Sequence, residues 1–211
     1  MTLRSILIGG GLLYLLCGCA VLEKRDLSAF YAHKPRSIVV VPVENESTEV
    51  TAPTMFITTI TVPLAERGYY VFPVYLTELL LRDLGLPEAG LIHQLPSQRF
   101  FEVFGADAVL LVTIKDWSTK YLLLASSVVV DIEYVLKDTR TGTVLWGSRQ
   151  HVAHNSEGSS LVEMAVQAAV NALLTDYLPL ARQANTQVFL PPRGLPAGPY
   201  HPDYGKDIGQ F

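Results

Sequence analysis

The N-terminus constrains this chain most, because its pattern separates residues 1–18 from the part of the chain that folds. One basic residue, Arg4, precedes an apolar stretch from Ile6 to Leu16 that only three glycines interrupt. Such a stretch is typical of a bacterial secretory signal, and it is too short and too lightly flanked for a stable membrane span. Residues 1–18 are therefore predicted to be a signal peptide.

The end of this stretch, Leu16-Cys17-Gly18-Cys19, resembles the lipobox of bacterial lipoproteins. The resemblance implies cleavage after Gly18 and acylation of Cys19, with a diacylglycerol on sulfur and an acyl chain on the new N-terminus. Several acyl chains anchor a protein far more firmly than one. Because Ala20 rather than Asp follows Cys19, the resemblance to Gram-negative lipoproteins further implies the outer membrane, with the domain in the periplasm or at the surface. The alternative is an ordinary signal peptide that contains cysteines.

The composition limits what the mature chain can do. Cleavage leaves 193 of the 211 residues, which is the size of one domain with extensions. The net charge of the whole chain is −4, and removing Arg4 makes it −5, so no polybasic surface for nucleic acid is expected. Cys17 leaves with the signal and Cys19 carries lipid, so a hydrophobic core must supply the stability without disulfides.

Three segments follow the signal. Residues 19–36 are charged and mixed and are expected to be a lipidated tether. Residues 37–185 carry strand and helix patterns and are expected to form a single α/β domain. Residues 186–211 form a Pro/Gly-rich tail: five of the 13 prolines fall within residues 191–211, so an extended or disordered segment is expected there.

Hydrophobic periodicity predicts the elements of the domain. Strands are expected at 38–43, 69–74, 106–116, 128–137 and 143–152, the first two buried. Helices are expected at 51–67, 77–84, 97–104 and 160–183, and a turn at 118–120. The order βαβα(α)βββα favours a mixed α/β (α+β) fold with a single mixed sheet of about five strands and helices packed on it.

Three stretches carry a resemblance to a known family. They are residues 65–74, residues 105–117 from Gly105-Ala106-Asp107 to Trp117, and Asp138-Thr139-Arg140-Thr141-Gly142 with Val144-Leu145-Trp146. Together they are similar to a family of proteobacterial lipoproteins of unknown function that includes a neisserial surface antigen. The resemblance covers about residues 15–185. It implies a domain like the amino-terminal domain of TolB and association with CsgG-like envelope proteins, but only Cys19 carries over as a functional residue.

These features agree best with a non-enzymatic docking or accessory module for an outer-membrane or periplasmic assembly. A lipid anchor raises the local concentration around membrane-embedded partners. The partner-binding candidates are Trp117 and Trp146 near strand ends, and Tyr200 and Tyr204 in the tail. Prolines stiffen the chain of the tail, so its exposed aromatic residues lose little conformational entropy when they bind a partner. An envelope protein is the expected partner, and a homo-oligomer is compatible with the same features.

Two other classes of function stay open. A periplasmic small-ligand or peptidoglycan-binding lipoprotein would need a concave pocket lined by Trp117, Trp146 and Tyr134, although such tryptophans more often pack in cores or at sheet edges. An envelope hydrolase would need a serine beside a base.

The hydrolase and any metal site have weak sequence support. Ser126 and Ser127 lie in an expected strand, and the chain has no Gly-x-Ser-x-Gly turn. His151 and His154 would point to opposite faces of a strand, so they would not share a metal ion. No catalytic residue, metal ligand or cofactor site is expected, apart from the acyl chains on Cys19.

Overall fold

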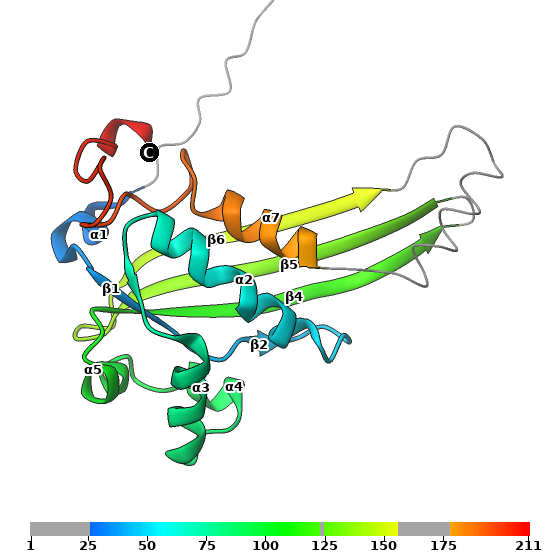
Figure 1. Ribbon diagram of the computed structural model, residues 1–211, viewed down its shortest axis with the longest axis horizontal. Coiled ribbons are helices and arrows are strands. Elements are labelled where there is room, and N and C mark those ends of the chain that lie inside the picture. The colour runs from blue at the N-terminus through cyan, green and yellow to red at the C-terminus, as the bar shows by residue number, and fades with distance from the viewer. Residues whose placement is uncertain (1–25, 123–124, 156–177) are drawn as a thin grey trace, which may run out of the picture.

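The strands form one mixed sheet (Figure 1) in the computed structural model, which describes residues 26–122, 125–155 and 178–211. They are β1 (Ser37–Val40), β2 (Glu44–Asn45), β3 (Tyr70–Val71), β4 (Ala108–Leu122), β5 (Ala125–Asp138) and β6 (Val144–Asn155). The order is β3-β1-β4-β5-β6, and β2 also pairs with β4. β1 runs parallel to β3 and β4, whereas β4, β5 and β6 are antiparallel. The predicted fold class is confirmed, with six strands in the sheet.

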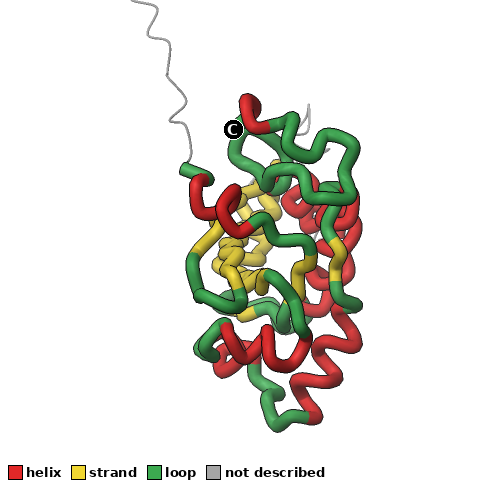
Figure 2. The backbone as a smooth tube through the Cα atoms, turned by 90° about the vertical axis from the view of Figure 1, so that its left-hand side faces the viewer, coloured by secondary structure: helices red, strands yellow, loops and turns green. Residues whose placement is uncertain are grey.

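Helices cover both faces of this sheet (Figures 1 and 2). They are α1 (Ser28–His33), α2 (Ala52–Glu66), α3 (Val74–Asp83), α4 (Ala89–His93), α5 (Gln98–Phe104) and α7 (Leu178–Val188), with a 3-10 turn, η1 (Ile208–Gln210). α1, α2 and α7 share the larger core with one face, and α3, α4 and α5 share a smaller core with the other. No helix of the described ranges is both long and apolar enough to span a membrane.

β1 is buried on both faces, as its continuous β-branched sequence predicts. Ile38 and Val40 belong to the larger core, and Val39 and Val41 to the smaller one. The second predicted buried strand is wrong in its length and burial. β3 has two residues at the sheet edge, and its Tyr70 is exposed.

The predicted turn at residues 118–120 is also wrong. β4 continues through it to Leu122, with Ser118 opposite Val129 and Lys120 opposite Ser127. Residues 118–120 are polar, and one of them is a β-branched threonine. Such residues are compatible with a strand when a long neighbouring strand, here β5, pairs with them. The predicted helix at 160–183 lies largely outside the described residues, and its last part is α7, which continues to Val188.

Both segments that were expected to be flexible pack on the domain. In the predicted tether, α1 and the residue before it bury Phe30 and Leu27. In the predicted tail, a series of apolar side chains is buried in the same core: Val188, Phe189, Leu195 and Phe211. The expectation of an extended or disordered tail is therefore wrong. Its irregular apolar spacing matches neither a helix nor a strand, so periodicity could not reveal that it packs.

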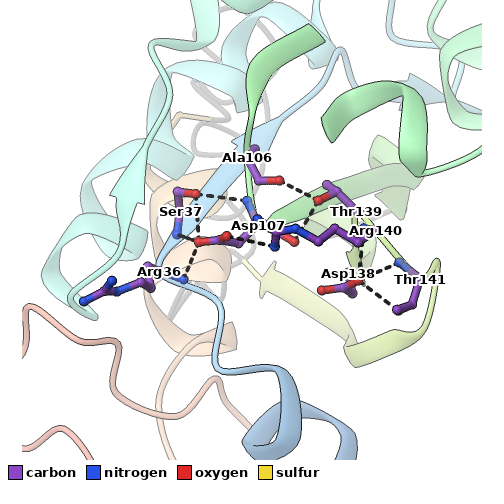
Figure 3. A network of polar contacts seen from close by, with 8 residues as sticks. All are labelled: Arg36, Ser37, Ala106, Asp107, Asp138, Thr139, Arg140 and Thr141. Atoms are coloured by element: carbon purple, nitrogen blue, oxygen red, sulfur yellow. Dashed lines mark hydrogen bonds and ion pairs between the residues drawn. The ribbon is translucent and has the colours of Figure 1, made fainter. Parts of the chain in front are cut away.

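A polar network around Asp107 joins three distant parts of the chain (Figure 3). Its Oδ2 accepts hydrogen bonds from Arg36 N (3.0 Å) and from Ser37 N (3.2 Å) and Oγ (3.1 Å) at the start of β1. Its Oδ1 accepts one from Arg140 Nη1 (3.2 Å), and its carbonyl oxygen accepts one from Thr139 N (3.0 Å), both in the β5–β6 turn. Two of the stretches that resemble the lipoprotein family, residues 105–117 and 138–142, meet in this network, so their role here is structural.

Replacing Asp107 by alanine should lower the free energy of unfolding by about 1–3 kcal/mol, because several backbone and side-chain donors lose their acceptor. Chemical denaturation of the purified protein measures the change. Asp83, exposed at the end of α3, provides the matched control, and Asp83→Ala should alter stability by less than about 0.5 kcal/mol. Equal effects of the two substitutions would contradict a structural role for the network.

The same carboxylate makes stability depend on pH. Burial alone would raise the pKa of Asp107, but the hydrogen bonds from Arg36, Arg140 and Ser37 outweigh it and lower the pKa. A lowered pKa in the folded state contributes stability above the pKa of the unfolded chain, about 3.9, and this contribution is lost as the pH falls through the folded value. The stability difference between the native protein and Asp107→Asn should thus be large at pH 7 and shrink in strong acid. A difference that does not vary with pH would refute this assignment.

Candidate protein-docking surface

The two predicted tryptophans are core residues. Trp117 is 1% exposed and Trp146 2% exposed, and the ring of Trp146 packs against those of Tyr134 and Phe189. Its Nε1 donates a hydrogen bond to the carbonyl oxygen of Arg193 (3.2 Å) in the C-terminal segment. The packing interpretation therefore holds for both rings.

The other predicted site residues lie apart from one another or outside the described chain. Tyr200 and Tyr204 are exposed on the C-terminal segment and remain candidates for contact with a partner. Cys19 lies outside the described residues, so its acylation remains a prediction.

The sheet also offers a histidine–carboxylate pair, His151 and Asp131, on its outer face. Asp131 accepts two hydrogen bonds of 2.8 Å from Arg149, and its Oδ2 lies 3.4 Å from His151 Nδ1. The hydrogen bonds from Arg149 are the main cause of the lowered pKa of Asp131. This aspartate is therefore engaged in an ion pair. Nowhere in the described ranges do three histidine, cysteine or acidic side chains gather as metal ligands.

Helix α3 presents an unusual apolar face to solvent, the α3 surface. Only Thr77 and Leu81 of this helix are buried. Five large apolar residues along the helix and at its C-terminal cap are 39–72% exposed: Tyr75, Leu76, Leu79, Leu80 and Leu84. Contiguous exposed apolar side chains on a folded protein mark interaction sites more often than chance would. The helix carries more leucines than one face can bury, so Leu81 is buried while Leu80 and Leu84 are exposed.

A groove of about 560 Å³, the acidic groove, lies between β2, the start of α2 and the start of α4, and Glu78 is the α3 residue that lines it. Its lining mixes polar residues with apolar ones, among them Ile57 and the 86% exposed Val50. Its rim carries three carboxylates from three different elements: Glu44, Glu78 and Glu88. Glu78 of α3 lines the groove, and Tyr75 of the α3 surface lies one turn before it on the same helix, so the two sites adjoin there.

Two contacts hold the rim of the groove in place. Glu78 pairs with Arg82 one turn later on α3 (2.6 Å). His93 of α4 lies under the rim, with Nδ1 3.3 Å from Glu44 Oε2 and Nε2 3.0 Å from the carbonyl oxygen of Pro42. Burial is the main cause of the lowered pKa of His93, so its ring stays neutral at pH 7 and the groove keeps its negative charge.

This face lies at the end of the domain remote from both described chain ends. In Figure 1, α1 and the C-terminus lie at the upper left, and α3 and α4 lie at the bottom. Figure 2 shows the same separation along the vertical after a quarter turn. Asp26, the first described residue, leads directly into α1.

Comparison with known proteins agrees with the sequence resemblance. Residues 25–199 match the family model "Putative lipoprotein GNA1162-like". The "Putative lipoprotein NMB1124/NMB1162" of Neisseria meningitidis serogroup B is 33% identical over 181 residues, which are 82% of this chain and 84% of that protein. The crystal structure of lipoprotein GNA1162 from Neisseria meningitidis is 34% identical, with a TM-score of 0.56 over 67% of this chain and 100% of that one. The chain therefore belongs to the GNA1162-like family of cell-envelope lipoproteins.

Proposed function

We propose that this protein is a non-enzymatic, lipid-anchored docking module of the outer membrane. In this proposal the α3 surface and the acidic groove bind an amphipathic, basic segment of a periplasmic or outer-membrane partner protein. The observations that support the proposal are the exposed leucines of α3 and the three carboxylates of the groove that the same helix lines through Glu78. CsgG-like envelope proteins, which the sequence resemblance implies as associates, are candidates for this partner.

The position of the predicted lipid anchor favours a partner that lies away from the membrane. Acylated Cys19 would be seven residues from Asp26, so an extended connection between them reaches at most about 25 Å. The α1 end of the domain would therefore stay close to the lipid, and the α3 end would face away from it (Figure 1). This placement makes a membrane surface a poor occupant of the α3 surface.

The chemistry of the face supports a helical occupant with basic residues. An amphipathic helix that lies in a groove buries an apolar stripe, and here the exposed leucines provide the matching surface. Lysine or arginine side chains flanking that stripe would complement Glu44, Glu78 and Glu88 on the rim. Complementary charge favours such a partner over an acidic one and speeds the encounter.

The apolar half of the site is tested with a double variant, Leu76→Gln with Leu80→Gln, and a synthetic amphipathic leucine–lysine helix as probe. Both leucines are exposed, so the fold should be unchanged, whereas affinity for the probe should fall roughly tenfold or more. Titration calorimetry measures the affinity. Val62→Gln, an exposed valine on α2, is the matched control and should bind like the native protein. Equal binding by all three proteins would refute the proposed site.

The acidic half is tested with Glu78→Gln combined with Glu88→Gln. The native protein should bind the leucine–lysine helix more tightly than a leucine–glutamate helix of the same pattern, and added salt should weaken the difference because exposed charges are screened. The double variant should lose this preference. A native protein that does not distinguish the two probes would show that the rim carboxylates play no part in selection.

A further inference from the structure

A second cavity, the anchor-end pocket, lies at the opposite end of the domain from the α3 surface. It has a volume of about 370 Å³ and lies between α1 and the C-terminal segment. Most of its lining side chains are apolar or aromatic, among them Phe30, Tyr69 and Ile208. The volume is within the range of ligand sites, which combine apolar walls with a few placed polar groups. The proposed docking at the α3 surface does not use this pocket.

The pocket opens to solvent beside three exposed side chains that line it. Tyr204 is 46% and Ile208 50% exposed, and Lys34 is exposed at the C-terminal end of α1. Tyr204 is also one of the residues that the sequence suggested for contact with a partner. Tyrosines are enriched at membrane–water interfaces, where the ring lies in an apolar layer and the hydroxyl in water. The mouth of the pocket therefore has side chains suited to the interface of a bilayer.

The accessible charge at this pocket is positive. Asp207 also lines the pocket, but its side chain is only 4% exposed and pairs with Arg67 (3.0 Å), so its charge is balanced inside the fold. Across residues 26–122, 125–155 and 178–211, no carboxylate forms an ion pair with the ammonium group of Lys34. A complementary ligand therefore carries an anionic group at the mouth and an apolar part inside.

The backbone at Lys34 does not account for a lysine at this position. Lys34 caps the C-terminal end of α1 with φ 49° and ψ 59°, and its N–H donates a hydrogen bond to the carbonyl oxygen of Phe30 (2.9 Å). Glycine most often occupies such a left-handed cap, because it has no Cβ to crowd the backbone. A glycine at position 34 would therefore suit the fold and remove only the charged side chain from the pocket.

We infer that the anchor-end pocket binds one acyl chain of an anionic phospholipid, with the lipid phosphate paired to Lys34. The acyl chain packs on the apolar and aromatic wall, and the phosphate stays at the mouth. The lipid comes from the bilayer that holds the protein, because the seven residues from Cys19 to Asp26 keep this end of the domain within about 25 Å of the predicted anchor (Figure 1). The inference rests on the lipid anchor of the proposed function and not on docking at α3.

The test uses the full acylated protein in phosphatidylcholine nanodiscs that contain a trace of a photoreactive lipid. The two probes are phosphatidylglycerol and phosphatidylcholine with the same diazirine-bearing acyl chain, and mass spectrometry locates the crosslinked residues. Crosslinks from phosphatidylglycerol should map to the pocket lining. Those from phosphatidylcholine should be about fivefold weaker there, the effect of one basic residue near an anionic lipid.

Two variants separate the charged part of the site from its apolar part. Lys34→Gly should abolish the preference for phosphatidylglycerol and keep or raise the thermal stability, because glycine suits the left-handed cap. Arg99→Gln, which removes an exposed cation outside the pocket lining, should keep the preference. Ile208→Asn should weaken crosslinking in the pocket by both lipids, whereas Val62→Asn, at an exposed valine on α2, should not.

The intact mass of the protein is measured first, because it shows whether the chain is acylated. A chain without acyl groups would refute the anchor and this inference together. In the acylated protein, equal crosslinking by the two lipids or an unchanged preference in Lys34→Gly would overturn the inference alone. So would a pocket that neither lipid labels, the result expected if the protein's own acyl chains fill it. Leu76→Gln with Leu80→Gln should crosslink normally, so the pocket and the docking surface can fail separately.

Discussion

The hydrogen bonds of Asp107 connect three segments of the chain that are distant from one another in the sequence. They join the first residues of β1, which follow α1, to the first residues of β4, which follow α5, and to the β5–β6 turn (Figure 3). Parallel strands have no tight turn between them, so their relative placement depends on side-chain contacts of this kind. The stretches that most clearly mark the family thus determine the fold, and the candidate binding surfaces lie elsewhere.

Periodic elements could be predicted from the sequence, and aperiodic packing could not. The buried β1 follows from its β-branched run, the helix α2 from Pro53 in its first turn and Gly68 past its end, and the end of α5 from left-handed Gly105. The C-terminal segment has the proline-rich composition that is typical of a disordered tail. Phe189 and Leu195 are nevertheless buried in the core. Which leucines of α3 are buried depends on where the sheet lies, and local sequence does not contain that information.

The two segments that resembled linkers therefore make one end of the domain different from the other. α1 and the C-terminal residues fold together at one end of the domain and border a pocket of about 370 Å³. α3 lies at the other end and exposes leucines beside an acidic groove. Membership of the GNA1162-like family is consistent with a role in the envelope, and the separation of the two ends is compatible with the proposed anchoring and the proposed docking at the same time.

The most direct test of the docking account is site-specific photo-crosslinking in cells that produce the acylated protein. A photoreactive amino acid replaces Leu79 on the α3 surface or, in a matched strain, Val62 on α2. The account predicts a crosslink from position 79 alone, to a heterologous envelope protein, with the captured peptide being an amphipathic segment rich in lysine or arginine. A crosslink to a second copy of this chain, to an acidic or non-amphipathic segment, or no crosslink at position 79, would contradict it.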